Sequence, residues 1–231
     1  MMIVGANMII REKDPRERAS EFALRVLREN IIMLELKPGT LVSENELAQV
    51  IGLSRTPIRE ALIELSKVEI VEILPQKGVF ISNINQSLVE EARFIRTVLE
   101  TAVIKEAAQK ASPEYIMKLE ECIKLQRYYL DNHNPEKLLE LDDEFHQLIF
   151  NSVDKNHTYK LMSSMMIHFD RVRNLSLQTI KDIRIVEDHE RIFKAIKEKD
   201  VVEAVKGIRE HLGRYQLDKN EIMESYKELF L

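Results

Sequence analysis

The sequence predicts a mainly α-helical protein, in which a small domain of three helices and a β-hairpin is followed by an all-α bundle. Of its 231 residues 45% are hydrophobic, but only 6 are Gly and 6 are Pro, which is too few for the turns of an all-β fold. Strand-like patterns end before Asn85. A chain of this length suits one small and one larger domain. We therefore expect domains at residues 1–84 and 85–231.

Three amphipathic helices are expected in the first domain. The first covers Pro15 to Leu34, because its apolar residues recur at helical spacing. Ser43, with Glu46 three residues later, predicts a capping box for the second helix, which ends at Gly52. Ser54 is a good N-cap for the third helix. The second and third helices are thus separated by a tight turn.

A β-hairpin is expected next. Residues 70–74 and 79–82 are rich in β-branched residues and flank Pro75-Gln76-Lys77-Gly78. Two short helices joined by a tight Gly turn, followed by a hairpin, predict a winged helix-turn-helix, whose second helix can lie in the major groove of DNA. Four polar residues occupy the outward, amino-terminal end of that helix: Ser54, Arg55, Thr56 and Arg59. Arginine can bond a guanine edge, and hydroxyl groups can bond phosphates.

The overall charge excludes a protein that coats nucleic acid by charge alone. The net charge is −5. Residues 1–84 carry 11 basic and 12 acidic side chains, and the remainder carries 23 and 27, so neither half is basic. DNA binding must therefore come from a local cluster of side chains on a shaped surface.

The run PGTLVSENELAQVIGLSRTPIREALIELSKVEIVEILPQKGVFI resembles the winged helix-turn-helix of the GntR family of bacterial transcription factors. The resemblance extends over nearly all of residues 20 to 84. It implies DNA contacts by Ser54, Arg55, Thr56 and Arg59, and by Lys77 and Gly78 at the tip of the wing. The chain departs from the family pattern at Asn45, where many relatives have Arg, and at Glu69, where they usually have Gly.

The second domain is expected to contain five or six helices, at about 87–111, 113–132, 135–151, 157–176, 179–198 and 200–229. Polar residues interrupt their apolar stripes. Asp142 and His146 are one turn apart on one face, and His189 and His211 lie on the apolar stripes of two other helices. Three inward imidazoles and one carboxylate form a plausible site for Zn, Ni, Mn or Fe(II).

Alternatives to a metal site stay open at the level of single residues. One buried His is more often a hydrogen-bonded core residue than a ligand, and Asp143 could replace Asp142. The patterns LDDEFH, EDHERIFKAI and REHL, however, resemble the FCD effector domain of the FadR branch of GntR regulators. In many members an Asp and three His bind a metal, and these match Asp142, His146, His189 and His211. His133 and His157 are expected in solvent, and His168 in the core.

Arg96 is a second polar residue on an apolar stripe, so its guanidinium needs an anionic partner. One interpretation is an intrahelical pair with Glu100. The other, implied by a matching Arg in FCD relatives, is that Arg96 binds a small carboxylate effector beside the metal, with Asn174 adding a hydrogen bond. Charge-assisted bonds would then connect the effector to Arg96.

The leading functional hypothesis is a ligand-responsive transcriptional regulator that binds a double-stranded DNA operator as a homodimer and is not an enzyme. We expect it in the cytoplasm and without membrane contact, because no apolar run approaches the length of a membrane span and Cys122 is a single cysteine. Two alternatives are a metalloenzyme domain tethered to DNA and a regulator whose metal is only structural. Against the enzyme, Asp143, Glu144 and Asp188 are expected at the surface rather than as a general base.

Overall fold

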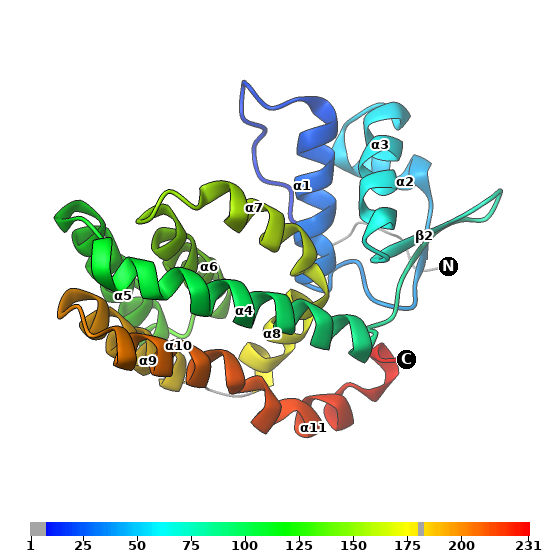
Figure 1. The fold of residues 1–231 in the computed structure, drawn as a ribbon. Helices are drawn as coiled ribbons and strands as arrows, with labels where there is room; N and C mark the ends of the chain where they lie inside the picture. The colour runs from blue at the N-terminus through cyan, green and yellow to red at the C-terminus, as the bar shows by residue number, and fades with distance from the viewer. Residues whose placement is uncertain (1–7, 180–182) are drawn as a thin grey trace. The chain divides into compact units, whose positions relative to one another are not determined.

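The computed structural model describes residues 8–179 and 183–231, and the chain divides into two compact units (Figure 1). One unit runs up to Val89 and also includes Tyr226–Leu231, whereas the other is Glu90–Ser225. The division falls close to the expected one at 84/85, but the last six residues belong with the amino-terminal unit. Ile84 N–H donates to the carbonyl of Leu229 (2.8 Å), and the N–H of Leu231 donates to the carbonyl of Ile84 (3.1 Å). No helix among the described residues is long and apolar enough to cross a membrane.

The amino-terminal unit contains three helices and a small sheet: α1 (Ala19–Ile32), β1 (Leu41–Val42), α2 (Glu44–Ile51), α3 (Arg55–Lys67), β2 (Val71–Leu74) and β3 (Gly78–Ile81). Its core forms where α3 packs on α1, α2 and β2. The predicted winged helix-turn-helix is confirmed. The sheet has a third strand, β1. The strand order is β1-β3-β2, and β3 pairs antiparallel with both of its neighbours. A two-residue strand is too short to show a period-2 pattern, so the sequence did not predict it.

Local backbone geometry explains the turns of this unit. Gly52 ends α2 in the left-handed conformation (φ +77°), as the sequence predicts. The expected capping box is absent: the Ser43 side chain accepts from the N–H of Asn45, and Glu46 makes no reciprocal bond in the described cap. Glu69 has φ +58°, a left-handed conformation that favours glycine. A glycine at this position would adopt the same conformation without strain.

The second unit contains eight helices among the described residues: α4 (Gln86–Lys110), α5 (Pro113–Asp131), α6 (Pro135–Asn151), α7 (Asn156–Met165), α8 (Ile167–Thr179), α9 (Ile183–Lys197), α10 (Val201–Gly213) and α11 (Tyr215–Ser225). Helix α4 begins in the amino-terminal unit and continues into this one. The all-α bundle is confirmed, and α4, α5 and α6 match their expected ranges within one residue. A 3₁₀ turn, Lys227–Leu229, follows α11.

Two expected helices are each divided in the structure. The predicted helix 157–176 is α7 and α8, which separate at Met166, and the predicted helix 200–229 is α10, α11 and the 3₁₀ turn. No Pro marks either break, although α10 ends at Gly213, and apolar periodicity continues across both positions. The start of the predicted helix 179–198 includes residues 180–182, which lie outside the described residues. The core of the unit forms where α5 packs on α6 and α9, α9 on α10, and α8 on α6 and α11.

Candidate DNA interface and metal centre

The amino-terminal end of α3 carries the expected DNA-facing residues. Ser54, Arg55, Thr56 and Arg59 are all exposed, while Ile58 on the opposite face is fully buried. The side chain of Arg55 is 67% exposed, and its Nη2 lies 4.0 Å from Glu44 Oε2. The basic side chains are therefore available to a partner, and a loose ion pair is the contact that orients Arg55.

The tip of the wing places Lys77 in solvent and gives Gly78 a second role. Gly78 has φ +124°, and a Cβ built on it would lie 2.6 Å from the carbonyl oxygen of Val42. A side chain cannot fit there, because β1 passes directly beside the strand. Gly78 is thus required by the sheet itself, whatever it contacts on DNA. Asn45, one of the two departures from the family pattern, is exposed at the start of α2.

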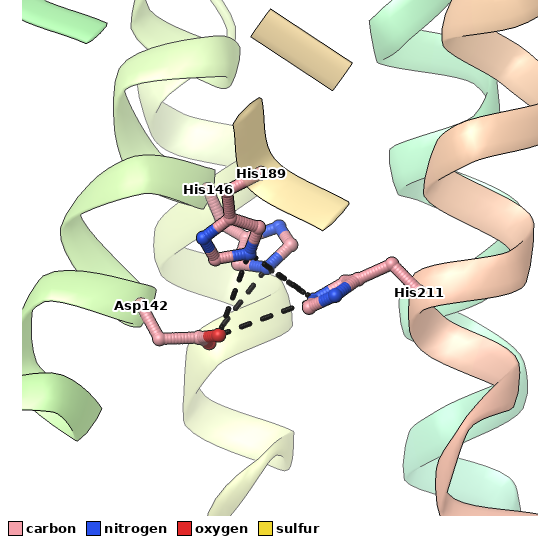
Figure 2. A group of neighbouring side chains, drawn as sticks. All are labelled: Asp142, His146, His189 and His211. Carbon is pink, nitrogen blue, oxygen red and sulfur yellow. Dashed lines mark hydrogen bonds and ion pairs between the residues drawn. The ribbon is translucent and has the colours of Figure 1, made fainter. Parts of the chain in front are cut away.

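In the second unit, the four predicted metal ligands lie together and are buried (Figure 2). Their candidate ligand atoms all lie within 4.8 Å of one another. His146 Nε2 is 3.2 Å from His211 Nε2, which is 3.3 Å from His189 Nε2. Asp142 oxygens lie 3.7, 3.5 and 4.0 Å from the Nε2 atoms of His146, His189 and His211. Helix α6 supplies two of the four residues, and α9 and α10 supply one each.

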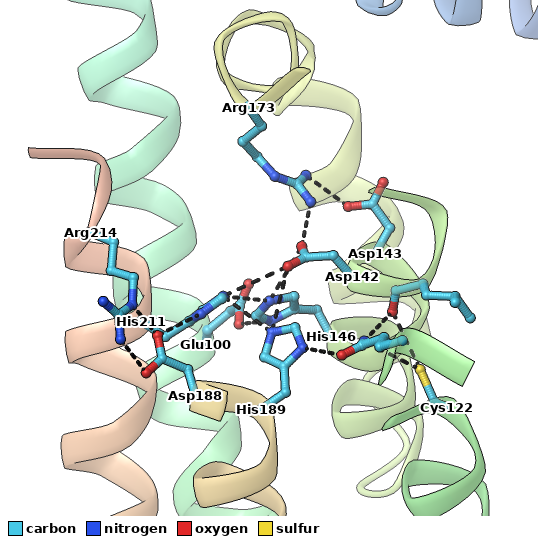
Figure 3. Close-up of polar contacts among 12 residues, drawn as sticks. Glu100, Cys122, Asp142, Asp143, His146, Arg173, Asp188, His189, His211 and Arg214 are labelled. Atoms are coloured by element: carbon cyan, nitrogen blue, oxygen red, sulfur yellow. Dashed lines mark hydrogen bonds and ion pairs between the residues drawn. The ribbon is translucent and has the colours of Figure 1, made fainter. Parts of the chain in front are cut away.

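The outward nitrogen of each imidazole faces an acceptor (Figure 3). His146 Nδ1 lies 2.5 Å from Glu100 Oε2, and His189 Nδ1 lies 2.8 Å from Gln126 Oε1. Asp188 Oδ2 is 3.4 Å from His211 Nδ1, an electrostatic contact without a hydrogen bond at that nitrogen. A carboxylate or an amide oxygen can only accept, so Nδ1 carries the proton in His146 and His189, and the nearby carboxylate of Asp188 favours the same tautomer in His211. In this tautomer the Nε2 lone pairs point to the centre.

Arginine side chains hold the carboxylates of the cluster in their ionised form. Burial alone would raise the pKa of Asp142, but Arg173 lowers it well below its usual range. Burial likewise opposes ionisation of Glu100, yet His146 and Arg96 lower its pKa to about 2. The pKa of Asp188 is also lowered: burial acts against this shift, and the hydrogen bond from Arg214 outweighs it. These carboxylates are therefore negatively charged.

Two of the imidazoles, those of His146 and His189, are in contrast held neutral. Burial lowers the pKa of His146 and lowers that of His189 well below its usual range. Neutral imidazole is the form that binds a metal ion. Three converging lone pairs and a carboxylate repel one another unless a cation lies between them.

These residues fit a divalent metal ion in spacing and in charge. Ligand atoms about 2.1 Å from one ion are roughly 3.0–3.4 Å apart, close to the spacings of the four side chains. Among the described residues, five carboxylates and three guanidiniums contact one another around the cluster: Glu100, Asp142, Asp143, Asp170 and Asp188, with Arg96, Arg173 and Arg214. The carboxylate among the four candidate ligands, that of Asp142, would offset part of the charge of a divalent ion.

Arg96 is buried on α4 and makes the expected pair with Glu100, from Nε to Oε1 at 2.6 Å. Its Nη2 also lies 3.6 Å from Asp142 Oδ2, and it lines a cavity of about 90 Å³ together with Asp142, Arg173 and His211. Asn174 is buried on α8, but it is absent from the described residues that line this cavity. The pair with Glu100 is thus present, and Arg96 also lies in the cavity wall, whereas effector binding by Arg96 stays a prediction.

Several supporting residues were not predicted. Gln126 and Arg173 carry no sequence signal, because polar residues on helices are usually solvated. Asp188 was expected at the surface, and this was wrong: it is 4% exposed and bonds Arg214. Asp143 contacts Arg173 rather than the cluster, and Glu144 is exposed. As expected, His133 and His157 are exposed and His168 is buried.

The architecture is that of helix-turn-helix DNA-binding proteins that carry a separate helical domain, and comparisons with known proteins agree. Residues 19–81 match the family described as bacterial regulatory proteins, gntR family, and residues 91–214 match the FCD domain. The chain belongs to the GntR family of transcriptional regulators and carries an FCD domain.

Individual relatives support this assignment over most of the chain. The chain is 29% identical to the transcriptional repressor RspR of Escherichia coli over 94% of its own length and 92% of the repressor's. It is 32% identical to a transcriptional regulator of Streptomyces ambofaciens, covering 88% and 86% of the two chains. The structure of E. coli McbR/YncC has the same fold, with a TM-score of 0.79 at 18% identity over 91% of this chain and 99% of that one. The protein is accordingly a transcriptional regulator and not an enzyme.

Proposed function

We propose that this regulator binds a palindromic operator as a homodimer and that its second unit binds a divalent metal ion and senses a small carboxylate there. The observation that carries the proposal is the convergence of three Nε2 lone pairs and Asp142 beside a cavity lined by Arg96. A transition metal with a coordination position left open would supply a Lewis acid for one carboxylate oxygen. Arg96 would bind the other oxygen.

The DNA contacts are assigned to Ser54, Arg55, Thr56 and Arg59 on α3, and to Lys77 and Gly78 in the wing. The exposure of the α3 side chains supports this assignment. The test uses an operator selected from random DNA. At constant salt, the Arg55→Ala and Arg59→Ala variants should bind this operator roughly 5- to 100-fold more weakly than the parent. Arg16→Ala, an exposed Arg before α1, is the control for lost charge. If both α3 variants bind the operator as tightly as the parent, the assignment is wrong. Sedimentation of the free protein and of its operator complex measures the stoichiometry.

The metal is tested by elemental analysis of protein purified without added metal. We expect about one equivalent of Zn, Ni, Mn or Fe in the parent and little in the His189→Ala, His211→Ala double variant. A His133→Ala, His157→Ala variant is the matched control, since both of these imidazoles are exposed. Equal metal uptake by the parent and both double variants would contradict the site.

A structural metal is the second candidate function, and the burial of all four candidate ligands favours it, because a cation would stabilise the converging imidazoles and Asp142 whether or not an effector binds. Removing the metal and measuring both the melting temperature and the affinity for the carboxylate distinguishes a structural metal from an effector-linked one. If the melting temperature falls and the affinity for the carboxylate does not change, the metal is structural only.

If an effector changes DNA affinity, it must bind the two relative poses of the DNA-binding units with different affinities. The proposal therefore requires a reciprocal effect. Operator DNA must change the affinity for the effector by the same factor by which the effector changes the affinity for operator DNA.

A further inference from the structure

We infer that the exposed face of α4 is the surface on which two copies of this chain meet, with the two α4 helices packed antiparallel about a two-fold axis at Val98. The inference rests on the proposed homodimer and names the face that forms it. It is carried by the pattern of exposed residues on α4, which is complementary to itself in both shape and charge.

The exposed residues of α4 between positions 91 and 105 form a single stripe. They are Glu91, Phe94, Val98, Ala102 and Lys105, and every other residue in this range is buried or half-buried. With about 3.6 residues per turn, these five side chains lie within about 40° of Val98 around the helix axis. The stripe is therefore one narrow face of the helix.

The middle of the stripe is apolar and lies in solvent. Phe94 is 69% exposed and Val98 is 50% exposed. Single exposed apolar residues are ordinary, but these two are one helical turn apart and are followed by the methyl group of Ala102, so burying them together would be favourable. The opposite face of the same turns is already occupied, because Arg96 and Glu100 contact the candidate metal ligands.

The two ends of the stripe carry opposite charges at equal distances from its centre. Glu91 lies seven residues before Val98, and Lys105 lies seven residues after it. Each charge is therefore about 10 Å from the centre along the helix axis. Within the described part of the chain, no ion pair engages either of these two side chains. Both charges are thus available to a partner.

A two-fold axis at Val98, perpendicular to α4, pairs this stripe with itself. In the antiparallel arrangement, residues equally far before and after Val98 lie at the same height on the two helices. The large Phe94 then lies beside the small Ala102 of the partner subunit. Glu91 lies beside Lys105 of the partner subunit, and the symmetry forms this ion pair twice. A parallel arrangement would instead place like charges side by side.

Val98→Glu tests the centre of the stripe. It would place two carboxylates together at the two-fold axis, so the dissociation constant of the dimer should rise by roughly 100-fold or more. Val202→Glu, at a 79% exposed position on α10, is the matched control and should leave this constant unchanged. Sedimentation of the full-length protein measures both variants, and circular dichroism checks that both are folded.

Exchange of charges tests the pairing. Glu91→Lys and Lys105→Glu should each raise the dissociation constant roughly 5- to 30-fold, because like charges then meet at both ends of the contact. Neither side chain has an ion pair in its own subunit, so these changes act on the dimer rather than on the fold. The double variant Glu91→Lys, Lys105→Glu should dimerise like the parent. An equimolar mixture of the two single variants should do so too, since every pair in a mixed dimer combines opposite charges.

The outcomes separate this interface from other arrangements. If the parent is a dimer and Val98→Glu dissociates no more than Val202→Glu, the inference is wrong and the homodimer uses another face. Leu125→Glu, at a 47% exposed position on α5, would then test the exposed apolar residues of that helix as the alternative. A mixture that dissociates as readily as the single variants contradicts the antiparallel pairing. A parent that is monomeric both free and on its operator overturns the proposed homodimer, and the inference fails with it.

Discussion

Gln126 sets the orientation of His189 although it carries no charge. Its amide nitrogen donates to the carbonyl of Leu141 on α6, and this leaves its oxygen to accept from His189 Nδ1. A rotated amide would lose the first bond and place two donors together. The amide therefore fixes the tautomer in which the Nε2 lone pair of His189 faces the cluster.

Gln126→Leu keeps the approximate shape of the side chain and removes the acceptor. We expect metal affinity to fall about 10- to 100-fold, measured by competition with a fluorescent zinc chelator. Gln109→Leu, at an exposed position on α4, is the control. An unchanged affinity in Gln126→Leu would show that burial alone orients His189.

The left-handed backbone at Glu69 predicts an unusual stabilising substitution. A non-glycine residue at φ +58° is strained by about 1 kcal/mol, so Glu69→Gly should raise the free energy of unfolding by up to about 1 kcal/mol. Glu72→Gly, at an exposed position within β2, should instead lower it by about 0.5–1 kcal/mol. Urea unfolding of both variants measures the two signs, and a destabilising Glu69→Gly would contradict the strain argument.

At the scale of elements, Glu90 connects α4 to α11. It bonds Arg93 on its own helix at 2.7 Å and, on α11, Lys219 at 3.0 Å and Gln216. Arg93 also donates to the carbonyl of Leu212 and lies over the ring of Tyr215, which lines the cavity. These contacts join the first turns of α4 to the cavity wall.

The Glu90 contacts predict a pH dependence. Burial would raise the pKa of Glu90, but Lys219 and Arg93 lower it below its usual value. The carboxylate therefore stabilises the folded state above the usual pKa of Glu, about 4.3, and loses this effect as the pH falls further. Glu90→Gln should be less stable than the parent at pH 7 by about 1 kcal/mol or less, since the group is partly exposed, and the difference should shrink between pH 5 and pH 3. Thermal melting across this range checks the trend, with the exposed Glu91→Gln as control. A difference that grows on acidification would reverse the argument.

At the scale of the whole molecule, the chain passes between the two units twice, after Val89 and after Ser225. The second passage leads into Tyr226–Leu231, whose backbone pairs with fully buried Ile84 in the segment between the wing and α4. The bundle is thus joined to the DNA-binding unit through α4 and also through the segment after α11.

Truncation after Ser225 should leave the N–H of Ile84 without its partner and uncover the Ile84 side chain. We expect faster hydrogen exchange at Ile84 and a lower melting temperature of the amino-terminal unit, while metal content is retained. Leu231→Ala, which keeps the backbone pairing to Ile84, is the control. Unchanged exchange at Ile84 after truncation would show that the pairing does not contribute to stability.

The sequence by itself determined the DNA-binding unit and the identity of the four clustered side chains. Cap residues, the Gly52 turn and helical periodicity are local signals, and Asp142 with His146 is a one-turn spacing on a single helix. The family resemblance then connected these two residues to His189 and His211, which are distant in sequence.

Only the tertiary structure decided which polar residues support that cluster. Glu100, Gln126 and Asp188 lie on α4, α5 and α9, and each contacts an imidazole that another helix carries. No pattern within one helix records such a contact, since burial of a polar side chain depends on what packs over it. For the same reason the sequence did not predict β1 or the pairing of Tyr226–Leu231 with Ile84, which both depend on strand partners far away in the chain.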